Sequence, residues 1–370
     1  MDYKKIDQIP IFFIVGVPRS GTTLLQQMLD ANPSVITPFE SGIIVFLKQK
    51  YFKKRNWTKA DVNCFIEDLY NEPKFVNGWN IDKTYLTQLY HSIPLKDVRY
   101  DLLLKLAYYS YPSIYDKSEI KLLGDKNPLY SWFVDEVKEV FPEAKFIHIV
   151  RDYRANILSN RIWFFRKNIS ILAQKWVITN KFIENQKTKS PENFYTVRYE
   201  DLVDNPEKYA REIALFLNID FDQNMLEHHK KATKVYSDPN AEKVTDYHRD
   251  FLGSLHENIV KPINKDRVDV WKIELTKEEI ALADYISIPY AKGYHYEAMY
   301  SEKSFDFLRK ALLAKIRITI DIFIIRIYQK FPGWIRKALR YFSVSLYKLF
   351  GVTHIFNPEL NRAKHSKSTN

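Results

Sequence analysis

The stretch "IFFIVGVPRSGTTLLQQMLDANP", residues 11–33, combines an apolar run, a turn with two glycines and an amphipathic segment. The apolar run at 11–16 predicts a buried strand. The segment 21–31 predicts a helix, because its apolar side chains recur at helical spacing and share one face: Leu24, Leu25, Met28 and Leu29. A strand, a tight turn and a helix in this order predict a loop that binds an anion at the start of the helix.

Gly16 and Gly21 have the spacing of the nucleotide-binding P-loop, G-x-x-x-x-G-K-[ST], but Thr22 stands where that motif has lysine. The glycines let the backbone approach a phosphate, Arg19 supplies a cation, and the hydroxyls of Thr22 and Thr23 add donors at the helix start. The loop therefore suits the 5′-phosphate group of a nucleotide. Without the lysine and a clear acidic strand end, Mg²⁺-dependent triphosphate chemistry is poorly supported.

Strands and helices continue to alternate along the chain. The segment "AKFIHIVRD" at 144–152 predicts a second buried strand, and a helical pattern follows it. Residues 193–219 repeat the order of strand, loop and amphipathic helix, whereas residues 41–120 are rich in aromatic side chains and predict short helices. We therefore predict an α/β fold with a P-loop-like parallel sheet flanked by helices, with ligands at the carboxyl ends of the strands.

Composition sets further bounds. With 370 residues, 46% hydrophobic and 15% aromatic, the chain can bury a sizeable core. The single cysteine, Cys64, cannot form an intrachain disulfide or a cysteine-based metal site, and an isolated cysteine is typically a buried apolar side chain. The N-terminal segment lacks the pattern of a secretory signal peptide, so we expect an intracellular, cytoplasmic protein.

The net charge of +11 is concentrated at the C-terminal end of the chain. Residues 301–370 hold 14 Lys and Arg against 4 Asp and Glu, whereas residues 1–300 hold 42 against 41. A nucleic-acid enzyme usually spreads a basic stripe over its body, so this distribution argues against a nucleic-acid partner. It predicts an α/β domain over residues 1–300 and a basic amphipathic helical tail over residues 301–370.

Residues 302–350 of this tail predict helices with mixed apolar and basic character. Charged side chains interrupt the apolar run before it reaches the length that spans a bilayer: Lys315, Arg317, Asp321 and Arg326. The stretch "GWIRKALRYFSVSLYKLFG" then gathers one apolar face, made of Trp334, Ile335, Ala338, Leu339, Phe342, Leu346 and Leu349. The basic side chains lie off that face: Arg336, Lys337, Arg340 and Lys348.

This pattern is typical of a helix that lies on an anionic membrane surface, here the inner face of the membrane. The alternative is a helix that packs on its own domain or on a second copy of the chain in a homodimer.

A second candidate phosphate site follows the strand at 144–152. In "VRDYRANILSN", Arg151 leaves the strand end and Ser159 comes eight residues later, about two helical turns on. Both could converge on one further phosphate, with bidentate donors from the arginine and a hydroxyl from the serine. The structural alternative is that Arg151 pairs with an acidic neighbour and Ser159 is an ordinary helix residue.

Taken together, "PRSGTTLL" after one strand and "RDYRANILS" after a later one resemble the two phosphate-binding elements of sulfotransferases that use 3′-phosphoadenosine 5′-phosphosulfate (PAPS). The segments "GDKNP", "RYEDLVDNPEKY" and "KPIN" with a later tryptophan occur in the order of the branch that includes the protein-tyrosine sulfotransferases. The resemblance covers residues 11 to about 272. It implies a P-loop-like α/β fold, no metal, and transfer of a sulfuryl group from PAPS to an acceptor hydroxyl.

The resemblance also implies roles for individual residues. Arg19 and the backbone of Ser20, Gly21, Thr22 and Thr23 would bind the phosphosulfate. The 3′-phosphate would be held by Arg151 and Ser159, and Tyr199 would contact the nucleotide near the adenine.

For the reaction itself, the resemblance implies three catalytic residues. Glu40 would be the base that accepts the proton of the acceptor hydroxyl. Lys126, together with Arg19, would neutralise the charge that develops on the transferred group and its bridging oxygen. The structural alternatives are that Glu40 caps the helix starting near Gly42, that Lys126 is a surface residue, and that Tyr199 belongs to the core.

The sequence departs from the branch's pattern near the loop that would cover the nucleotide. The branch's catalytic serine aligns with Leu255, and Ser254, one residue away, is the candidate for nucleotide binding at this place. An arginine after the 3′-phosphate serine is replaced by Trp163, with Arg161 two residues earlier. A basic residue near Trp271 is displaced to Lys272.

Several functional alternatives stay open at this point. The acceptor could be a lipid or sterol alcohol, a glycan, a tyrosyl peptide or another small molecule, and the basic tail and the aromatic segment favour a hydrophobic, membrane-proximal one. One rival function is a P-loop kinase-like phosphotransferase with a degenerate loop. The other is a non-enzymatic, membrane-associated nucleotide-binding protein.

Overall fold

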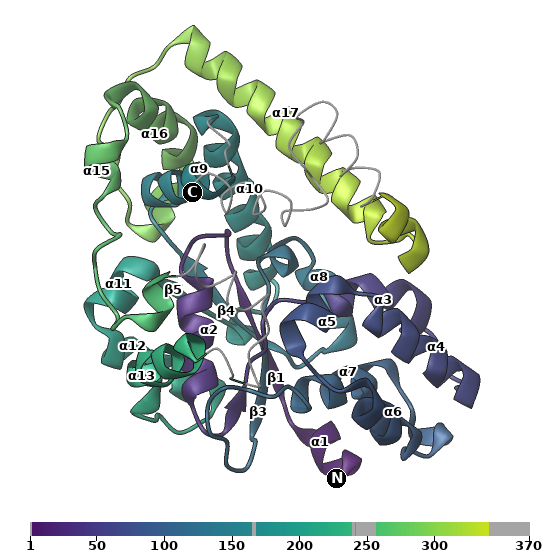
Figure 1. The fold of residues 1–370 in the computed structure, drawn as a ribbon. Helices are drawn as coiled ribbons and strands as arrows, with labels where there is room; N and C mark the ends of the chain where they lie inside the picture. The colour runs from purple at the N-terminus through teal and green to yellow at the C-terminus, as the bar shows by residue number, and fades with distance from the viewer. Residues whose placement is uncertain (1, 165–167, 239–240, 242–256, 340–370) are drawn as a thin grey trace.

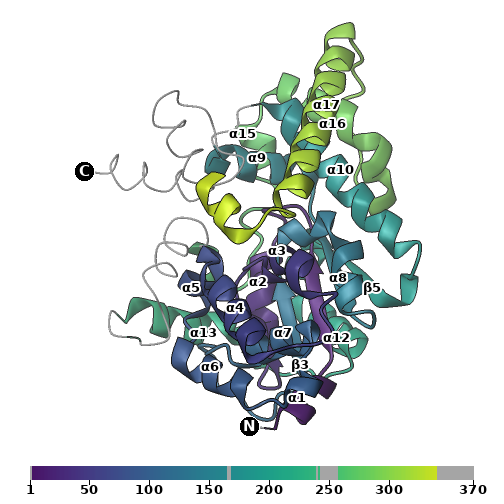
Figure 2. The same ribbon diagram turned by 90° about the vertical axis from the view of Figure 1, so that its right-hand side faces the viewer.

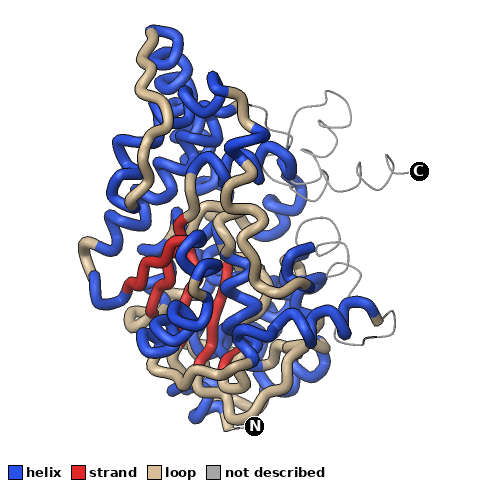
Figure 3. The backbone as a smooth tube through the Cα atoms, turned by 90° about the vertical axis from the view of Figure 1, so that its left-hand side faces the viewer, coloured by secondary structure: helices blue, strands red, loops and turns tan. Residues whose placement is uncertain are grey.

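The computed structural model describes residues 2–164, 168–238, 241 and 257–339. Within these residues the chain forms a five-stranded, all-parallel sheet with the order β2-β3-β1-β4-β5. Figures 1 and 3 show this sheet at the centre of the molecule, surrounded by helices. Its strands are β1 (Ile11–Val15), β2 (Val35–Ile36), β3 (Leu122–Lys126), β4 (Lys145–Val150) and β5 (Phe194–Arg198). The predicted α/β fold is confirmed.

The central strand β1 explains why helices cover both faces of the sheet. Successive side chains of a strand point to opposite faces. Phe12 and Ile14 therefore pack into one core cluster with Leu25 and Met28, while Phe13 and its neighbours pack into a second cluster on the other side. All five residues of β1 are buried, as expected for a parallel strand with two covered faces.

The helices group around these clusters. On the face of Phe12 lie α2 (Thr22–Ala31), α11 (Tyr199–Asp204), α12 (Pro206–Leu217) and α13 (Asn224–Ser237). The aromatic segment packs on the opposite face as α3 (Ile43–Tyr51), α4 (Lys59–Tyr70), α5 (Pro73–Trp79), α6 (Lys83–His91), η1 (Leu95–Asp97) and α7 (Tyr100–Tyr109). With it pack α1 (Tyr3–Gln8), η2 (Pro128–Trp132) and α8 (Val134–Val140).

A further helical layer packs on Val17, which follows β1, and on Val150, which ends β4. It contains α9 (Tyr153–Phe164), α10 (Ile169–Lys187), α15 (Trp271–Glu274), α16 (Lys277–Ala291) and α17 (Phe305–Tyr328). Short 3₁₀ segments join these parts: η3 (Pro191–Asn193), η4 (Glu257–Val260) and η5 (Lys292–Tyr294). Helix α17 packs along α10 and contacts α16, and it runs along the outside of the molecule in Figures 1 and 2.

One expectation about the core is wrong. Cys64 lies on α4 and is exposed. Its position on α4 explains the difference, because the buried stripe of that helix is formed by Val62, Phe65, Ile66 and Leu69 and leaves residue 64 on the outer side.

The C-terminal segment also differs from the prediction. Residues 333–339 are helical, and Trp334 is 73% exposed as expected for a surface helix. Arg336, predicted to lie off the apolar face of a helix on a membrane surface or on its own domain, is 2% exposed and forms a buried ion pair with Glu72. Its guanidinium also donates to the carbonyl oxygen of Phe46 at 2.9 Å. Residues 340–370, with the remaining predicted face residues, lie outside the described part of the chain.

Arg336 therefore anchors the chain after α17 to the helices of the aromatic segment, residues 41–120, which we call the aromatic layer. Among the described helices, none combines the length and the apolarity that crossing a membrane requires.

The Arg336–Glu72 pair predicts a large stability effect. Replacing one partner leaves the other charge buried without compensation, so Arg336→Met should lower the free energy of unfolding by about 3–5 kcal/mol in urea denaturation. The double variant Arg336→Met/Glu72→Leu should recover part of that loss, because it leaves no buried charge.

The exposed pair Lys230–Glu227 provides the matched control. Lys230→Met should change the free energy of unfolding by less than about 1 kcal/mol. An equal effect of the two single variants would contradict the anchoring role of Arg336.

Candidate functional site

Every strand of the sheet delivers a predicted site residue at its carboxyl end. Glu40 follows β2, Lys126 ends β3, the glycine loop follows β1, Arg151 follows β4 and Tyr199 follows β5. Because parallel strands place their carboxyl ends at one edge of a sheet, these residues gather along that edge in the strand order. The order runs from Glu40 and Lys126 on one side, across the loop, to Arg151 and Tyr199 on the other.

The loop after β1 requires its two glycines. Gly16 has a φ of +155° and Gly21 a φ of +95°. A Cβ on Gly16 would lie 2.5 Å from the carbonyl oxygen of Ile149, and a Cβ on Gly21 would lie 2.5 Å from the ring of Tyr199. Gly21 is also the N-cap of α2, so the free N–H groups of that helix start directly after the loop. Strand, loop and helix thus have the predicted geometry, and binding of an anion by this loop stays a prediction.

Side chains from neighbouring elements hold the loop in place. Asn156 of α9 donates to the carbonyl oxygen of Pro18 at 2.9 Å and to the hydroxyl of Ser20 at 3.0 Å. Asn160, one turn later, donates to the same carbonyl at 3.1 Å. From η2, the hydroxyl of Ser131 accepts from the N–H of Gly16 at 2.9 Å. The sequence analysis missed these three residues, although two asparagines one turn apart beside Ser159 were a signal that this helix face meets a polar partner.

The side chain of Arg19 links the two predicted phosphate elements. Arg19 itself adopts a left-handed backbone conformation, with a φ of +73°. Its Nε donates to the hydroxyl of Ser159 at 3.1 Å. The backbone near Arg19 therefore belongs to the loop, whereas its guanidinium lies at the serine predicted to hold the 3′-phosphate. Non-glycine residues in this conformation are uncommon and concentrate at functional sites.

Arginines dominate the electrostatics at this point. Arg151 donates to the carbonyl oxygens of Arg19 at 3.1 Å and of Arg267 at 2.5 Å. Burial, followed by the positive charges of Arg151 and Arg267, lowers the pKa of Arg19 to about 9. The Nε of the buried Arg151 has no hydrogen-bond partner among the described residues. An anion between these side chains would relieve the repulsion, so the cluster fits a phosphate group. Arg267 was not predicted.

Tyr199 completes this side of the site. It is 8% exposed, packs in a core cluster, and its ring faces both the loop at Gly21 and the guanidinium of Arg151, which lies 4.5 Å above the ring. The ring thus stacks on the arginine and also supports the loop. Contact with an adenine stays a prediction.

On the other side of the loop, Glu40 and Lys126 meet. The Nζ of Lys126 lies 3.5 Å from one carboxylate oxygen of Glu40, and the Nζ of Lys74 donates to the other at 2.6 Å. Lys126 is 2% exposed, and burial lowers its pKa, while the charge of Glu40 acts in the opposite direction. In the sheet register Lys126 lies opposite Ile14, two residues before the loop. Lys74, from α5, was not predicted.

The segment that carries Glu40 is fixed by the aromatic layer. The buried indole of Trp79 donates to the carbonyl oxygen of Phe39 at 2.6 Å. The helix that follows, α3, has Gly42 as its N-cap and no side-chain capping bond. The alternative role of Glu40 as a helix cap is therefore not what the structure shows. Lys126 is likewise not a surface residue.

Other predicted residues lie elsewhere. Ser254 and Leu255, and the side chain of Trp163, lie outside the described residues. Arg161 pairs with Glu279 of α16 at 2.8 Å and so points away from Ser159. Lys272 pairs with Asp269 at 2.9 Å.

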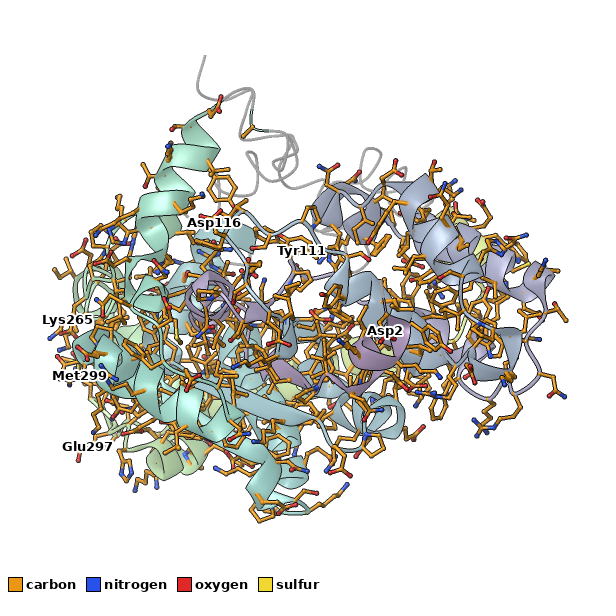
Figure 4. All side chains as sticks on the ribbon, turned by 90° about the horizontal axis from the view of Figure 1, so that it is seen from below. Asp2, Tyr111, Asp116, Lys265, Glu297 and Met299 are labelled. Atoms are coloured by element: carbon orange, nitrogen blue, oxygen red, sulfur yellow. The ribbon has the colours of Figure 1, made fainter. Side chains whose placement is uncertain are left out.

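A pocket of about 530 Å³ opens beside this region, between the segments around Asp152, Arg198, Trp271 and Tyr296. Glu297 and Met299, which also line it, lie at the outer rim of the molecule in Figure 4. None of the predicted binding residues lines this pocket. Among the described residues, no group of three or more His, Cys, Asp or Glu side chains could hold a metal ion; that the reaction needs no metal stays a prediction.

The arrangement provides two different chemical environments on one sheet edge. The loop, the start of α2 and the arginine cluster can bind two anionic groups of one ligand. Beside them, a carboxylate and a buried ammonium face each other and can accept a proton and stabilise developing negative charge.

Comparison with known proteins supports the sequence resemblance. The model of the sulfotransferase family matches residues 10–223, more than half of the chain. Protein-tyrosine sulfotransferase A of Caenorhabditis elegans is 25% identical over 289 residues, which cover 75% of this chain and 65% of the relative. Protein-tyrosine sulfotransferase 1 of Danio rerio is 27% identical over 271 residues, which cover 71% of this chain and 66% of the relative.

The chain thus matches about two thirds of the length of these relatives. Among solved structures, the sulfotransferase domain from the Synechococcus PCC 7002 olefin synthase has a TM-score of 0.52 at 23% identity. That similarity covers 78% of this chain and 95% of the domain, and it shows the same fold. On the family match, which spans the glycine loop, Lys126, Arg151 and Tyr199, this chain belongs to the sulfotransferase family.

Proposed function

We propose that this protein is an enzyme that transfers a sulfuryl group from PAPS to an acceptor hydroxyl and releases adenosine 3′,5′-bisphosphate. The observation that carries the proposal is the order of groups on the sheet edge: the arginine cluster at Ser159, then the glycine loop, then the Lys126–Glu40 pair. PAPS carries a 3′-phosphate at one end and, at the other, a 5′-phosphate that bears the sulfuryl group, so its groups follow the same spatial order.

In this proposal each end of the donor has its own residues. The 3′-phosphate takes the place between Arg19, Arg151 and the hydroxyl of Ser159, where the nearest strong charges are positive. The 5′-phosphosulfate lies on the backbone N–H groups from Ser20 to Thr23 at the start of α2. Tyr199 lies beside both elements and so supports the nucleoside between them.

The chemical step follows from the other end of the edge. The acceptor oxygen attacks the sulfur, its proton passes to Glu40, and the bond from sulfur to the bridging phosphate oxygen breaks. Lys126 neutralises the negative charge that grows on this oxygen as the bisphosphate leaves. The lysine is held at the loop by β3, so its charge needs no rearrangement during the reaction.

The acceptor is proposed as a hydroxyl group only. The relatives in Caenorhabditis elegans and Danio rerio are named for protein tyrosine, whose phenol is one such hydroxyl. A direct assay covers the acceptor classes together: incubation with PAPS and a panel of tyrosyl peptides, glycans, sterols and lipid alcohols, with sulfated products detected by mass spectrometry. A sulfate mass shift on any of them supports the proposal, and its absence on the whole panel with PAPS bound contradicts it.

Replacing Glu40 separates transfer from nucleotide binding. Glu40→Gln removes the base but keeps the size of the side chain, so the transfer rate should fall by about 10²–10⁴-fold. Binding of adenosine 3′,5′-bisphosphate should change little, because Glu40 lies on the acceptor side of the loop. Rates are measured at saturating PAPS with the acceptor found in the panel.

Glu139→Gln is the matched control, since Glu139 lies exposed on α8 in an ion pair with Lys48. It should keep the transfer rate of the unchanged protein. A Glu40→Gln protein that transfers as fast as this control would remove Glu40 from the mechanism.

The buried position of Lys126 predicts a pH dependence. Burial lowers the pKa of Lys126, and only its charged form can neutralise the leaving oxygen. The value of kcat/KM should therefore hold at lower pH and fall as pH rises through a pKa below the ordinary lysine value of about 10.4. Lys126→Arg should shift this fall to higher pH, because arginine stays charged.

If Lys126→Arg is inactive, NMR titration of ¹³C-labelled lysines in the unchanged protein locates the same ionisation directly. A Lys126 signal that titrates at or above the ordinary value would contradict this account of the alkaline limb.

A further inference from the structure

The outer side of α17 is the largest concentration of exposed apolar side chains in the described chain. Ten of the sixteen large apolar side chains that are exposed lie between residues 305 and 334. They are Phe305, Leu308, Leu312, Leu313, Ile316, Ile320, Phe323, Ile327, Phe331 and Trp334. We call these ten residues the outer stripe. Contiguous exposed apolar patches of this kind mark surfaces that bind a protein or a membrane.

The outer stripe follows one face of the helix. At 100° per residue, its eight members within α17 cover an arc of about 140° over a helix roughly 36 Å long. All ten side chains are exposed, from 37% at Phe331 to 81% at Phe305. Phe331 and Trp334 follow the end of α17 at Tyr328. Within α17 the stripe is therefore continuous, in contrast to the scattered single apolar residues that are normal on a protein surface.

The opposite face of α17 is already occupied. Phe307, Ala314, Ile318 and Ile322 are buried where the helix packs along α10 and α16. Figures 1 and 2 show the helix lying along the outside of this layer. An ordinary surface helix has one apolar face and one polar face. Because α17 has apolar residues on two opposite faces, its outer stripe needs a partner of its own.

Charge indicates which partner fits. Residues 301–339 hold nine Lys and Arg against three Asp and Glu, and one of the three, Asp321, is buried. Lys315 and Arg317 lie at the two edges of the stripe on the helix surface and are exposed. Lys303, Lys315, Lys330 and Lys337 are exposed and take part in no ion pair among the described residues. Apolar side chains flanked by uncompensated cations are the pattern of a helix that lies on anionic lipid.

A second copy of this chain fits the same surface less well. Two outer stripes packed against each other would bring two sets of lysine and arginine side chains together with few acidic partners, and such like-charge contacts oppose association. An anionic bilayer matches both features of this surface, because its apolar interior takes up the apolar side chains and its negative headgroups attract the lysine and arginine side chains. We propose that the outer stripe of α17 docks flat on an anionic lipid bilayer surface and holds the protein there.

Helix α17 lies within residues 302–350, for which the sequence predicted contact with an anionic membrane surface, and the proposal assigns that contact to its outer stripe. It also sets an orientation. The stripe ends at Trp334, two residues before Arg336, whose ion pair with Glu72 ties this end to the start of α5. Helix α5 carries Lys74, which pairs with Glu40. The bilayer would thus meet the molecule on the side of α5, whose Lys74 holds the predicted base Glu40.

Vesicle sedimentation with the full chain tests the proposal. The protein should sediment with vesicles of phosphatidylcholine and phosphatidylserine and bind vesicles of phosphatidylcholine alone at least about tenfold more weakly, and added salt should weaken binding to the first. Leu312→Glu/Phe323→Glu places two charges in the stripe and should weaken binding to anionic vesicles by about tenfold or more. Neither residue lies in the proposed transfer site, so nucleotide binding should stay unchanged.

The matched control is Leu215→Glu, because Leu215 is an apolar residue of α12 that is 81% exposed and lies off the stripe. Its vesicle binding should equal that of the unchanged protein, and equal melting temperatures show that both variants fold. Three results would overturn the proposal: no sedimentation with anionic vesicles, equal loss in the control, or a dimer in lipid-free solution that Leu312→Glu/Phe323→Glu dissociates.

Discussion

The parallel sheet imposes the constraint on which the site depends. Parallel strands end at the same edge, and in this protein all five strand ends carry a residue of the predicted site. The charged residues at the strand ends therefore lie along the sheet edge in the strand order β2-β3-β1-β4-β5. Glu40 and Lys126 come from β2 and β3, and Arg151 and Tyr199 come from β4 and β5, with the loop between them. Glu40 and Lys126 lie apart from Arg151 and Tyr199 because β1 lies between the two pairs of strands that carry them.

Hydrogen bonds and packing keep this edge ordered although it concentrates positive charge. Asn156, Asn160 and Ser131 hold the loop through its backbone and through Ser20. Around them Arg19 and Arg151 are kept close despite their repulsion, because each donates to a neutral oxygen. A site organised before its anion arrives loses little free energy in ordering side chains when it binds. Thr22 stands where the P-loop motif has lysine, and in the proposed mechanism the cation beside the transferred group is Lys126 from β3.

Local patterns predicted much of this arrangement. The apolar runs predicted β1, β4 and β5, and the glycine spacing predicted the loop, because each depends on residues close in sequence. Contacts between distant segments could not be predicted this way. Lys74 reaches Glu40 across 34 residues, Arg267 reaches Arg151 across 116, and Arg336 reaches Glu72 across 264. Nothing local to these residues indicates a partner that only the packing of the aromatic layer and the C-terminal segment brings near.

The central claim is that the sheet edge recognises a nucleotide with both a 3′-phosphate and a 5′-phosphate group. Isothermal titration calorimetry in the presence of EDTA tests it most directly, by comparing adenosine 3′,5′-bisphosphate with adenosine 5′-monophosphate, and with ATP and Mg²⁺ in a separate titration without EDTA. The account predicts that the bisphosphate binds at least about tenfold more tightly than the monophosphate, because the monophosphate leaves Arg19, Arg151 and Ser159 without an anion. Equal affinity for the two, or tight binding of ATP with Mg²⁺ alone, would contradict it.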